Sequence, residues 1–296
     1  MILTGIGDEA GAPLDAQIKA ARQLGWSHLE MRAVELPGFA RGNLHDIPEQ
    51  AFELAAARLQ EAGVGVYCFA STIANWSAKL SDPFQITLDQ VRRCIPRMQR
   101  LGANYVRIMS YKPDDAESKT PPEVFRRVAE VTRMFRDAGL QPVHENCMNY
   151  GGMSWRHALE LLEKCPGLKW VFDTGNPVFN PDRSLPPPWP RQNPWEFWEH
   201  IRDHVVHIHV KDAIYVPAKR DCDYTYPGKG RGRVRDILAN ALGRGYDGGI
   251  SIEPHVAVVF HDAAAQPEGQ VLFDSFVRYG RELASMIAEI KAGVSG

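Results

Sequence analysis

Six glycines stand at the ends of helix-like segments, each just before a short apolar run, and this alternation constrains the fold more than any other feature. Five of them, at positions 25, 63, 102, 139 and 167, are 38, 39, 37 and 28 residues apart, and Gly245 follows 78 residues later. A glycine just beyond a helix supplies the left-handed backbone position with which many helices end. The long gap contains a further strand-like run, 205–210, and another run, 2–6, opens the chain. The pattern predicts eight strands alternating with about eight helices.

The segments between these strands have the spacing of amphipathic helices. Apolar residues recur three or four positions apart at Leu14, Ile18, Ala21 and Leu24, and again at Val124, Val128, Val131 and Phe135. Eight such units in 296 residues, without a linker, predict an α/β fold in which residues 1–296 form a single (β/α)8 TIM barrel. A doubly wound open sheet is the alternative. It is disfavoured because the segment after the first strand, 5–11, reads GIGDEAG and lacks the G-x-G-x-x-G of dinucleotide-binding sheets.

Composition narrows the class of protein. The formal net charge of −2 lacks the basic excess of nucleic-acid-binding proteins, so we expect no nucleic-acid partner. Five scattered cysteines without a C-x-x-C pair argue against a disulfide framework or a thiolate zinc site. No apolar run approaches the roughly 20 residues needed to span a bilayer, and the opening residues lack the pattern of a signal peptide. We therefore expect a cytoplasmic protein without a membrane partner.

Four strand-like runs in the second half of the chain each end in a side chain that can bind a metal. These side chains are Glu145, Asp173, His209 and Glu253. The carboxyl ends of the strands carry the active site in TIM barrels, so the four side chains are expected to converge on one face. Their oxygen-rich set suits one hard divalent cation, Mn²⁺ or Mg²⁺ first, with Zn²⁺ or Co²⁺ as alternatives.

Other polar residues also stand at strand ends, and two long loops follow the candidate ligands. Asp8, Glu9, Glu30, Arg32 and Ser71 occupy such ends, and for each of them a solvated boundary residue is the preferred interpretation. The loops lie near 177–195 and 212–231, on the face expected to hold the site. Loops of this length either cover a pocket or form an oligomer contact, so a homo-oligomer is left open.

Five short motifs resemble those of one family in its order and near its spacings. They are His-Glu-Asn at 144–146, Phe-Asp-Thr-Gly-Asn-Pro at 172–177, His-Ile-His-Val-Lys-Asp at 207–212, Pro-Gly-Lys-Gly at 227–230 and Ser-Ile-Glu-Pro-His at 251–255. As an ordered set they resemble the xylose-isomerase-like TIM-barrel family of sugar and sugar phosphate isomerases and epimerases. The likeness extends from Gly5 to Glu253.

The resemblance implies roles for individual residues. Glu145, Asp173, His209 and Glu253 match the family's four ligands to a divalent metal, and Glu145 and Glu253 match its catalytic, proton-exchanging carboxylates. The second histidine of H-x-H is the usual ligand, so His207 is expected to be a core residue. Further candidates for substrate binding are Arg107, Asn176, Lys211, Lys229 and His255.

Two departures limit the assignment of a substrate. Asn176 stands where ketose 3-epimerases have a histidine, and Tyr215 stands where they have an arginine. The apurinic-site endonucleases share this barrel but use a trinuclear zinc centre with more histidines, of which only His209 has a clear match here.

The expected function is a divalent-metal-dependent isomerase or epimerase of a sugar, sugar phosphate or keto sugar. It would act by carboxylate-mediated proton transfer through an enediolate on a small-molecule carbohydrate. A metal-dependent dehydratase or lyase on a 3-keto sugar, keto-glycoside or keto-inositol is the alternative, because loss of a β-substituent can follow the same proton abstraction. A non-enzymatic sugar-binding barrel remains as a third hypothesis.

Overall fold

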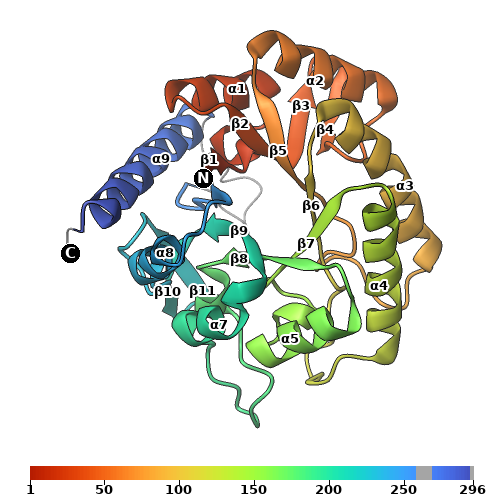
Figure 1. The fold of residues 1–296 in the computed structure, drawn as a ribbon, viewed down its shortest axis with the longest axis vertical. Helices are drawn as coiled ribbons and strands as arrows, with labels where there is room; N and C mark the ends of the chain where they lie inside the picture. Colours follow the sequence, from red (N-terminus) through yellow and green to blue (C-terminus); the bar gives the residue numbers. More distant parts are fainter. Residues whose placement is uncertain (258–268, 294–296) are drawn as a thin grey trace.

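Eight parallel strands form the inner sheet in a computed structural model, which describes residues 1–257 and 269–293 (Figure 1). Their order around the sheet is β1, β12, β9, β8, β7, β6, β5, β2. The strands are β1 (Ile2–Gly5), β2 (His28–Met31), β5 (Gly65–Ala70), β6 (Tyr105–Ile108), β7 (Gln141–Glu145), β8 (Lys169–Asp173), β9 (Val205–Val210) and β12 (Gly249–Ile252). A parallel bridge between Ile6 and Glu30 joins the first and last strands of this order, so the barrel is nearly closed. The predicted (β/α)8 TIM barrel is confirmed.

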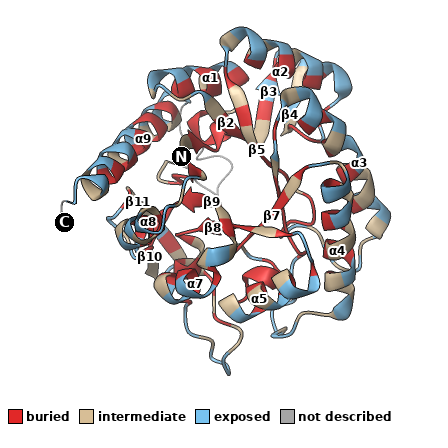
Figure 2. Cartoon of the chain, viewed as in Figure 1, coloured by how far each residue is buried: buried red, intermediate tan, exposed pale blue. Residues whose placement is uncertain are grey.

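Helices surround the sheet and turn their apolar faces toward it. They are α1 (Leu14–Gln23), α2 (Glu49–Ala62), α3 (Phe84–Leu101), α4 (Pro122–Asp137), α5 (Trp155–Lys164), α6 (Asn176–Phe179), α7 (Pro194–Ile201), α8 (Val234–Gly243) and α9 (Gly269–Lys291). Figure 2 shows their inner faces buried and their outer faces exposed. In α4 the apolar positions noted in the sequence, such as Val128 and Phe135, are buried against the sheet. None of the helices in the described ranges has an apolar stretch long enough to cross a membrane.

The glycines behave as the repeat predicts. Gly25, Gly63, Gly102, Gly139, Gly167 and Gly245 all have φ between 65° and 90°. An L-residue adopts this left-handed region only with strain, whereas glycine enters it freely and ends the preceding helix. The repeated glycine therefore reports where each helix turns back toward the next strand.

Residues along the inner strands alternate between the barrel interior and the helix layer. Val143 and Val171 pack together in the interior, while Trp170 and Phe172 face outward against α7. Since side chains two positions apart in a strand share a face, the residues that follow the interior valines by two also point inward. Asp173 follows Val171 in this way, so its carboxylate lies at the top of the interior.

Two antiparallel hairpins interrupt the alternation of strand and helix. One consists of β3 (Ala33–Leu36) and β4 (Phe39–Asn43), and the other of β10 (Asp212–Val216) and β11 (Asp221–Thr225). The second hairpin occupies most of the segment near 212–231 that the sequence presents as a loop. It packs against the segment near 177–195, because Arg191 stacks on the Tyr215 ring and donates to its hydroxyl. The two long segments thus contact each other beside the carboxyl ends of β8 and β9.

Candidate metal and active site

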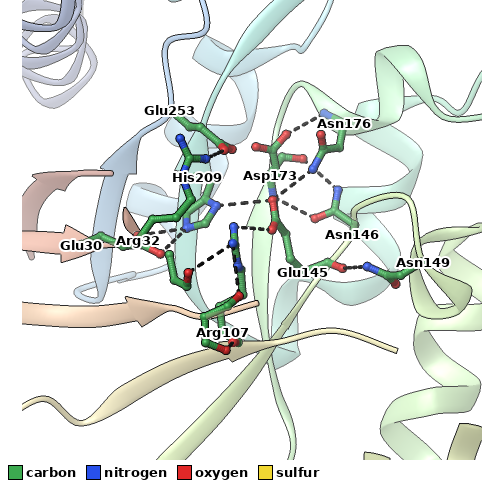
Figure 3. Close-up of polar contacts among 12 residues, drawn as sticks. Glu30, Arg32, Arg107, Glu145, Asn146, Asn149, Asp173, Asn176, His209 and Glu253 are labelled. Atoms are coloured by element: carbon green, nitrogen blue, oxygen red, sulfur yellow. Dashed lines mark hydrogen bonds and ion pairs between the residues drawn. The ribbon is translucent and has the colours of Figure 1, made fainter. Parts of the chain in front are cut away.

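Four buried side chains from neighbouring strands converge at the carboxyl end of the barrel. Each of Glu145, Asp173, His209 and Glu253 offers one ligand atom, and these atoms lie within 4.8 Å of one another. Strand register explains the convergence, since Asp173 and Ser251 both lie opposite His209 and Glu253 follows Ser251 by two residues. Figure 3 shows the carboxylates turned toward the imidazole. We call these four residues the quartet.

Glu145 is held at both carboxylate oxygens. Its Oε2 accepts a hydrogen bond from Arg107 Nη1 at 2.9 Å, and its Oε1 accepts one from Asn176 Nδ2 at 3.1 Å. Nδ1 of His209 lies 3.5 Å from the same Oε1. Burial alone would raise the pKa of Glu145, but the charges of Arg107 and His209 bring that pKa down to about 2. Glu145 is therefore an ionised carboxylate with a defined orientation.

Asp173 is oriented by the turn that follows it. Its Oδ1 accepts hydrogen bonds from the backbone N–H groups of Gly175 and Asn176, at 2.8 and 2.6 Å. Asn146 secures the end of the strand, because its side chain donates to the Asp173 carbonyl and accepts from the Asp173 N–H, both at 2.8 Å. Burial raises the pKa of Asp173 to about 6, against the attraction of Lys211. Its second oxygen, Oδ2, is left facing the quartet.

A buried carboxylate beneath the quartet fixes the imidazole of His209. Nε2 of His209 lies 3.0 Å from both oxygens of Glu30, and Nε2 of His207 lies 2.7 Å from Oε2 of Glu30. The other ring nitrogen of His207 lies 3.0 Å from the carbonyl oxygen of Gly249. Burial lowers the pKa of His209, but Glu30 and Glu145 outweigh it and raise that pKa to about 10. The arrangement turns Nδ1 of His209 toward the quartet and keeps His207 in the interior.

Glu253 lies between two cations. Its Oε1 accepts from Arg32 Nη1 at 2.9 Å, and its Oε2 accepts from Lys211 Nζ at 2.8 Å. Arg32 Nη2 also donates to Glu9 Oε1 at 2.7 Å, and His255 Nδ1 lies 2.9 Å from the same oxygen. Burial would raise the pKa of Glu253, but Lys211, His255 and Arg32 hold that pKa well below its usual value.

The structure brings four of the five predicted substrate-binding residues to the quartet. Arg107 and Asn176 contact Glu145, Lys211 contacts Asp173 and Glu253, and His255 lies 3.7 Å from Glu253. Lys229, by contrast, is exposed in the segment after β11 and joins no ion pair with the described residues.

Three further residues at the site were present at the predicted strand ends but were interpreted as boundary residues. Glu30, Arg32 and Glu9 are all engaged in the network around the quartet. Glu30 carried a recognisable signal, because it stands between the apolar residues Leu29 and Met31 in a short strand, and it is fully buried. A carboxylate in such a position needs a partner, which here is the histidine pair.

The quartet fits a divalent cation. Among the described residues, Asp173 Oδ2 and His209 Nδ1 are buried and make no hydrogen bond, although Lys211 Nζ lies 3.1 Å from the first and Glu145 Oε1 lies 3.5 Å from the second. Buried polar atoms rarely lack partners unless an ion or water satisfies them. Three carboxylates and one imidazole form the oxygen-rich set that Mg²⁺ and Mn²⁺ prefer, and zinc also accepts such ligands.

A family model described as "Xylose isomerase-like TIM barrel" matches residues 18–274 of the chain. No curated protein matches the sequence.

Solved structures share the fold at low sequence identity. A D-tagatose 3-epimerase-like protein is 17% identical, with 100% of both chains covered and a TM-score of 0.71. The IOLI protein with a bound zinc atom is 12% identical, covering 98% of this chain and 99% of its own, with a TM-score of 0.70. The probable 3-DHS dehydratase AsbF from Bacillus anthracis is 14% identical, covering 96% and 99%, with a TM-score of 0.68. Enzymes of different reaction classes therefore share this barrel.

Proposed function

The chain belongs to the xylose isomerase-like TIM barrel family, and we propose that it is a divalent-metal-dependent isomerase or epimerase of a sugar, sugar phosphate or keto sugar. The observation that carries the proposal is the placement of Glu145 and Glu253. Their strands, β7 and β12, are the outer members of the arc β12, β9, β8, β7, so the two carboxylates flank Asp173 and His209. An ionised carboxylate on one side of a bound substrate can remove a proton, and a carboxyl group that carries a proton can then return one elsewhere.

The four residues of the quartet have different proposed roles in metal binding and proton transfer. Asp173 and His209 hold the cation, and Glu145 and Glu253 exchange protons with substrate carbon while also contributing ligand atoms. A divalent cation at this position supplies Lewis-acid stabilisation of the negative charge that develops on substrate oxygens. Mn²⁺ or Mg²⁺ is the proposed ion because oxygen ligands predominate, although one solved structure of similar fold holds zinc.

The surrounding residues orient the proton-transfer groups. Arg107 and Asn176 fix the two oxygens of Glu145, and Arg32 fixes Oε1 of Glu253. The low pKa values of Glu145 and Glu253 keep both carboxylates ionised at neutral pH in the free site, so either can act as the base, and the carboxyl group that has accepted a proton can then serve as the acid. A carboxylate that is already oriented toward the proton it removes reacts faster, because no orientational freedom is lost during the reaction.

The segments near 177–195 and 212–231 are proposed to cover the substrate. Tyr224 of β11 lies edge-on to the His255 ring, with centroids 5.0 Å apart, so the hairpin reaches the site. Arg191 joins the other segment to this hairpin through Tyr215. A cover of this kind excludes water from a proton-transfer reaction. Arg107, Asn176, Lys211 and His255 are the proposed contacts to substrate oxygens.

A dehydratase or lyase acting on a 3-keto sugar, keto-glycoside or keto-inositol is the second candidate. The similarity in fold to the probable 3-DHS dehydratase favours keeping it, since the first proton abstraction is common to both reactions. The two candidates differ in the second step of the reaction, because an epimerase or isomerase returns the proton, whereas a lyase expels water or an alkoxide from the neighbouring carbon.

Solvent-deuterium exchange tests the proposal. Keto sugars and keto-glycosides are incubated with the protein and Mn²⁺ in heavy water, and deuterium at carbon is followed by NMR. We expect exchange that falls by about 10²–10⁴-fold in Glu145→Gln and Glu253→Gln. Glu123→Gln, on the surface of α4, serves as the control and should exchange normally. Full exchange in Glu145→Gln would refute its role, and loss of water or an aglycone would favour the lyase.

A further inference from the structure

The ammonium group of Lys211 lies inside the quartet rather than at the surface. Nζ is 2.8 Å from Glu253 Oε2 and 3.1 Å from Asp173 Oδ2, and the lysine side chain is 6% exposed. A lysine is rarely buried to this extent without paired carboxylates. Here it joins two of the four residues that form the candidate metal site.

Two neighbouring residues, Thr174 and Gly175, position this lysine. Thr174 Oγ1 donates to the Lys211 carbonyl oxygen at 2.6 Å and accepts from the Lys211 N–H at 3.1 Å. A Cβ added at Gly175 would lie 2.8 Å from Lys211 Cγ and 3.0 Å from the Lys211 carbonyl oxygen, so the absence of a side chain there makes room for the lysine stem. The two residues that follow Asp173 in sequence thus position Lys211, which directly follows β9.

The oxygens that Lys211 contacts are the ones that Asp173 and Glu253 have left for a cation. Asp173 Oδ1 is committed to two backbone N–H groups of its own turn, and Glu253 Oε1 is committed to Arg32. A divalent ion bound through the remaining oxygens would lie within a few ångströms of the ammonium. Like charges this close repel each other strongly at the effective dielectric of a protein site, so the two cations disfavour each other there.

We propose that Lys211 is the internal counter-ion of the metal-free site, that a divalent cation displaces its ammonium from Asp173 and Glu253, and that the freed ammonium then donates to a substrate oxygen. This inference rests on the proposed metal-binding role of the quartet. Thr174 and Gly175 position the lysine in this account. The affinity of the site for a divalent cation then depends on how readily that cation replaces the Lys211 ammonium.

Charge compensation of Asp173 and Glu253 explains the buried position of Lys211. Buried carboxylates left without a positive partner strongly destabilise a fold. With Lys211 in place, Asp173 and Glu253 are compensated before the metal arrives, so the barrel folds without it. The cation then enters a site that is already shaped, and the attraction it gains is reduced by the lysine pairs it breaks.

The test compares Mn²⁺ binding to the wild-type chain, Lys211→Met and Lys219→Met by titration calorimetry. Lys219 pairs with Asp223 on the surface of the β10–β11 turn and is the matched control. We expect Lys211→Met to bind Mn²⁺ at least about tenfold more tightly, equivalent to about 1.4 kcal/mol. Its metal-free form should melt at a lower temperature. Equal or weaker Mn²⁺ binding by Lys211→Met would overturn the inference.

A second measurement uses the wild-type chain, in case Lys211→Met fails to fold. Isotope-labelled lysine ammonium groups are observed by NMR during titration with diamagnetic Mg²⁺, with Lys211→Arg used for assignment. We expect the protected resonance of Lys211 to shift or vanish as Mg²⁺ binds. A resonance that stays unchanged at saturation would overturn the inference alone. A wild-type chain that binds neither Mn²⁺ nor Mg²⁺ would instead defeat the proposed function.

Discussion

Arg107 and Glu145 form a buried ion pair across two neighbouring strands. Nη1 of Arg107 lies 2.9 Å from Oε2 of Glu145, and the two side chains are 6% and 2% exposed. Arg107 lies opposite Val143 in the parallel register of β6 and β7. Glu145 follows Val143 by two residues and therefore lies on the same inner face. The guanidinium also reaches the carbonyl oxygens of Ala70 and Ser71. Arg107 thus anchors the proposed base to the interior of the barrel.

Replacing Arg107 should lower the free energy of unfolding. In Arg107→Met the carboxylate of Glu145 would remain buried without its strongest partner, and loss of one member of a buried pair costs about 3–5 kcal/mol. Urea unfolding of the metal-free protein measures the change. Arg126→Met, which removes an exposed pair with Glu123 on α4, is the matched control and should cost less than about 1 kcal/mol. Equal losses in the two variants would show that Arg107 is not an anchor.

Glu30 should control metal affinity without touching the metal. Its carboxylate fixes the ring of His209 through Nε2, which leaves Nδ1 for the cation. In Glu30→Gln this acceptor is neutral and must still serve two histidines, so we expect Mn²⁺ affinity to fall by about 10–100-fold. Calorimetric titration measures it. Glu35→Gln, in the β3–β4 hairpin, is the control, and a Glu30→Gln protein that binds as tightly as this control would contradict the prediction.

The hydroxyl of Thr174 should matter more than its methyl group. Thr174→Val removes both hydrogen bonds to the Lys211 backbone and leaves the buried groups unpaired, which costs about 1–3 kcal/mol. Thr174→Ser keeps the hydroxyl and should retain most of the stability. Thermal unfolding of both variants provides the comparison. If Ser destabilised the fold as much as Val, packing of the methyl group would be the dominant contribution.

Acid should destabilise the fold in part through His45, which lies after β4 and far along the chain from the quartet. Burial lowers the pKa of His45 to about 4, and the side chain hydrogen-bonds to Asn43. Between pH 6.5 and 4 the unfolded chain binds a proton that the folded chain rejects. Stability therefore falls as the pH falls, by up to about 3 kcal/mol from this residue.

The contribution of His45 can be isolated by substitution. His45→Gln cannot titrate, so its unfolding free energy should depend less steeply on pH between 6.5 and 4 than that of the wild-type chain. Denaturant unfolding at several pH values measures both slopes. Parallel slopes would mean that His45 is not kept neutral by burial.

Local signals explain why the barrel could be predicted from sequence. A left-handed glycine marks a helix end through backbone sterics alone, so Gly63 and Gly102 needed no tertiary information. The hairpins were missed for the converse reason. The strand Phe39–Asn43 has no clear apolar alternation and β11 is largely polar, so neither carries a strong strand signal of its own, although each pairs with the strand just before it in the chain.

Some features of the candidate site could likewise be predicted from the sequence, and others could not. Asp173 and His209 could be placed together because each ends an apolar run and parallel strands end on one face. Lys211 could be named as a substrate-binding candidate, but its pairing with Asp173 and Glu253 could not be inferred, since a flexible four-carbon stem can point outward or fold back. Its inward course depends on the space at Gly175 and the hydroxyl of Thr174, which become adjacent only when β8 and β9 pair.

Anomalous diffraction from crystals grown with Mn²⁺ would locate the cation that the quartet is proposed to bind. We predict one strong manganese peak at the carboxyl end of the barrel, about 2.0–2.6 Å from ligand atoms of Glu145, Asp173, His209 and Glu253. Asp173→Ala crystals, prepared in the same way, should lose the peak. A wild-type crystal saturated with Mn²⁺ that shows no peak among these four side chains, or a peak elsewhere, would contradict the proposed metal site.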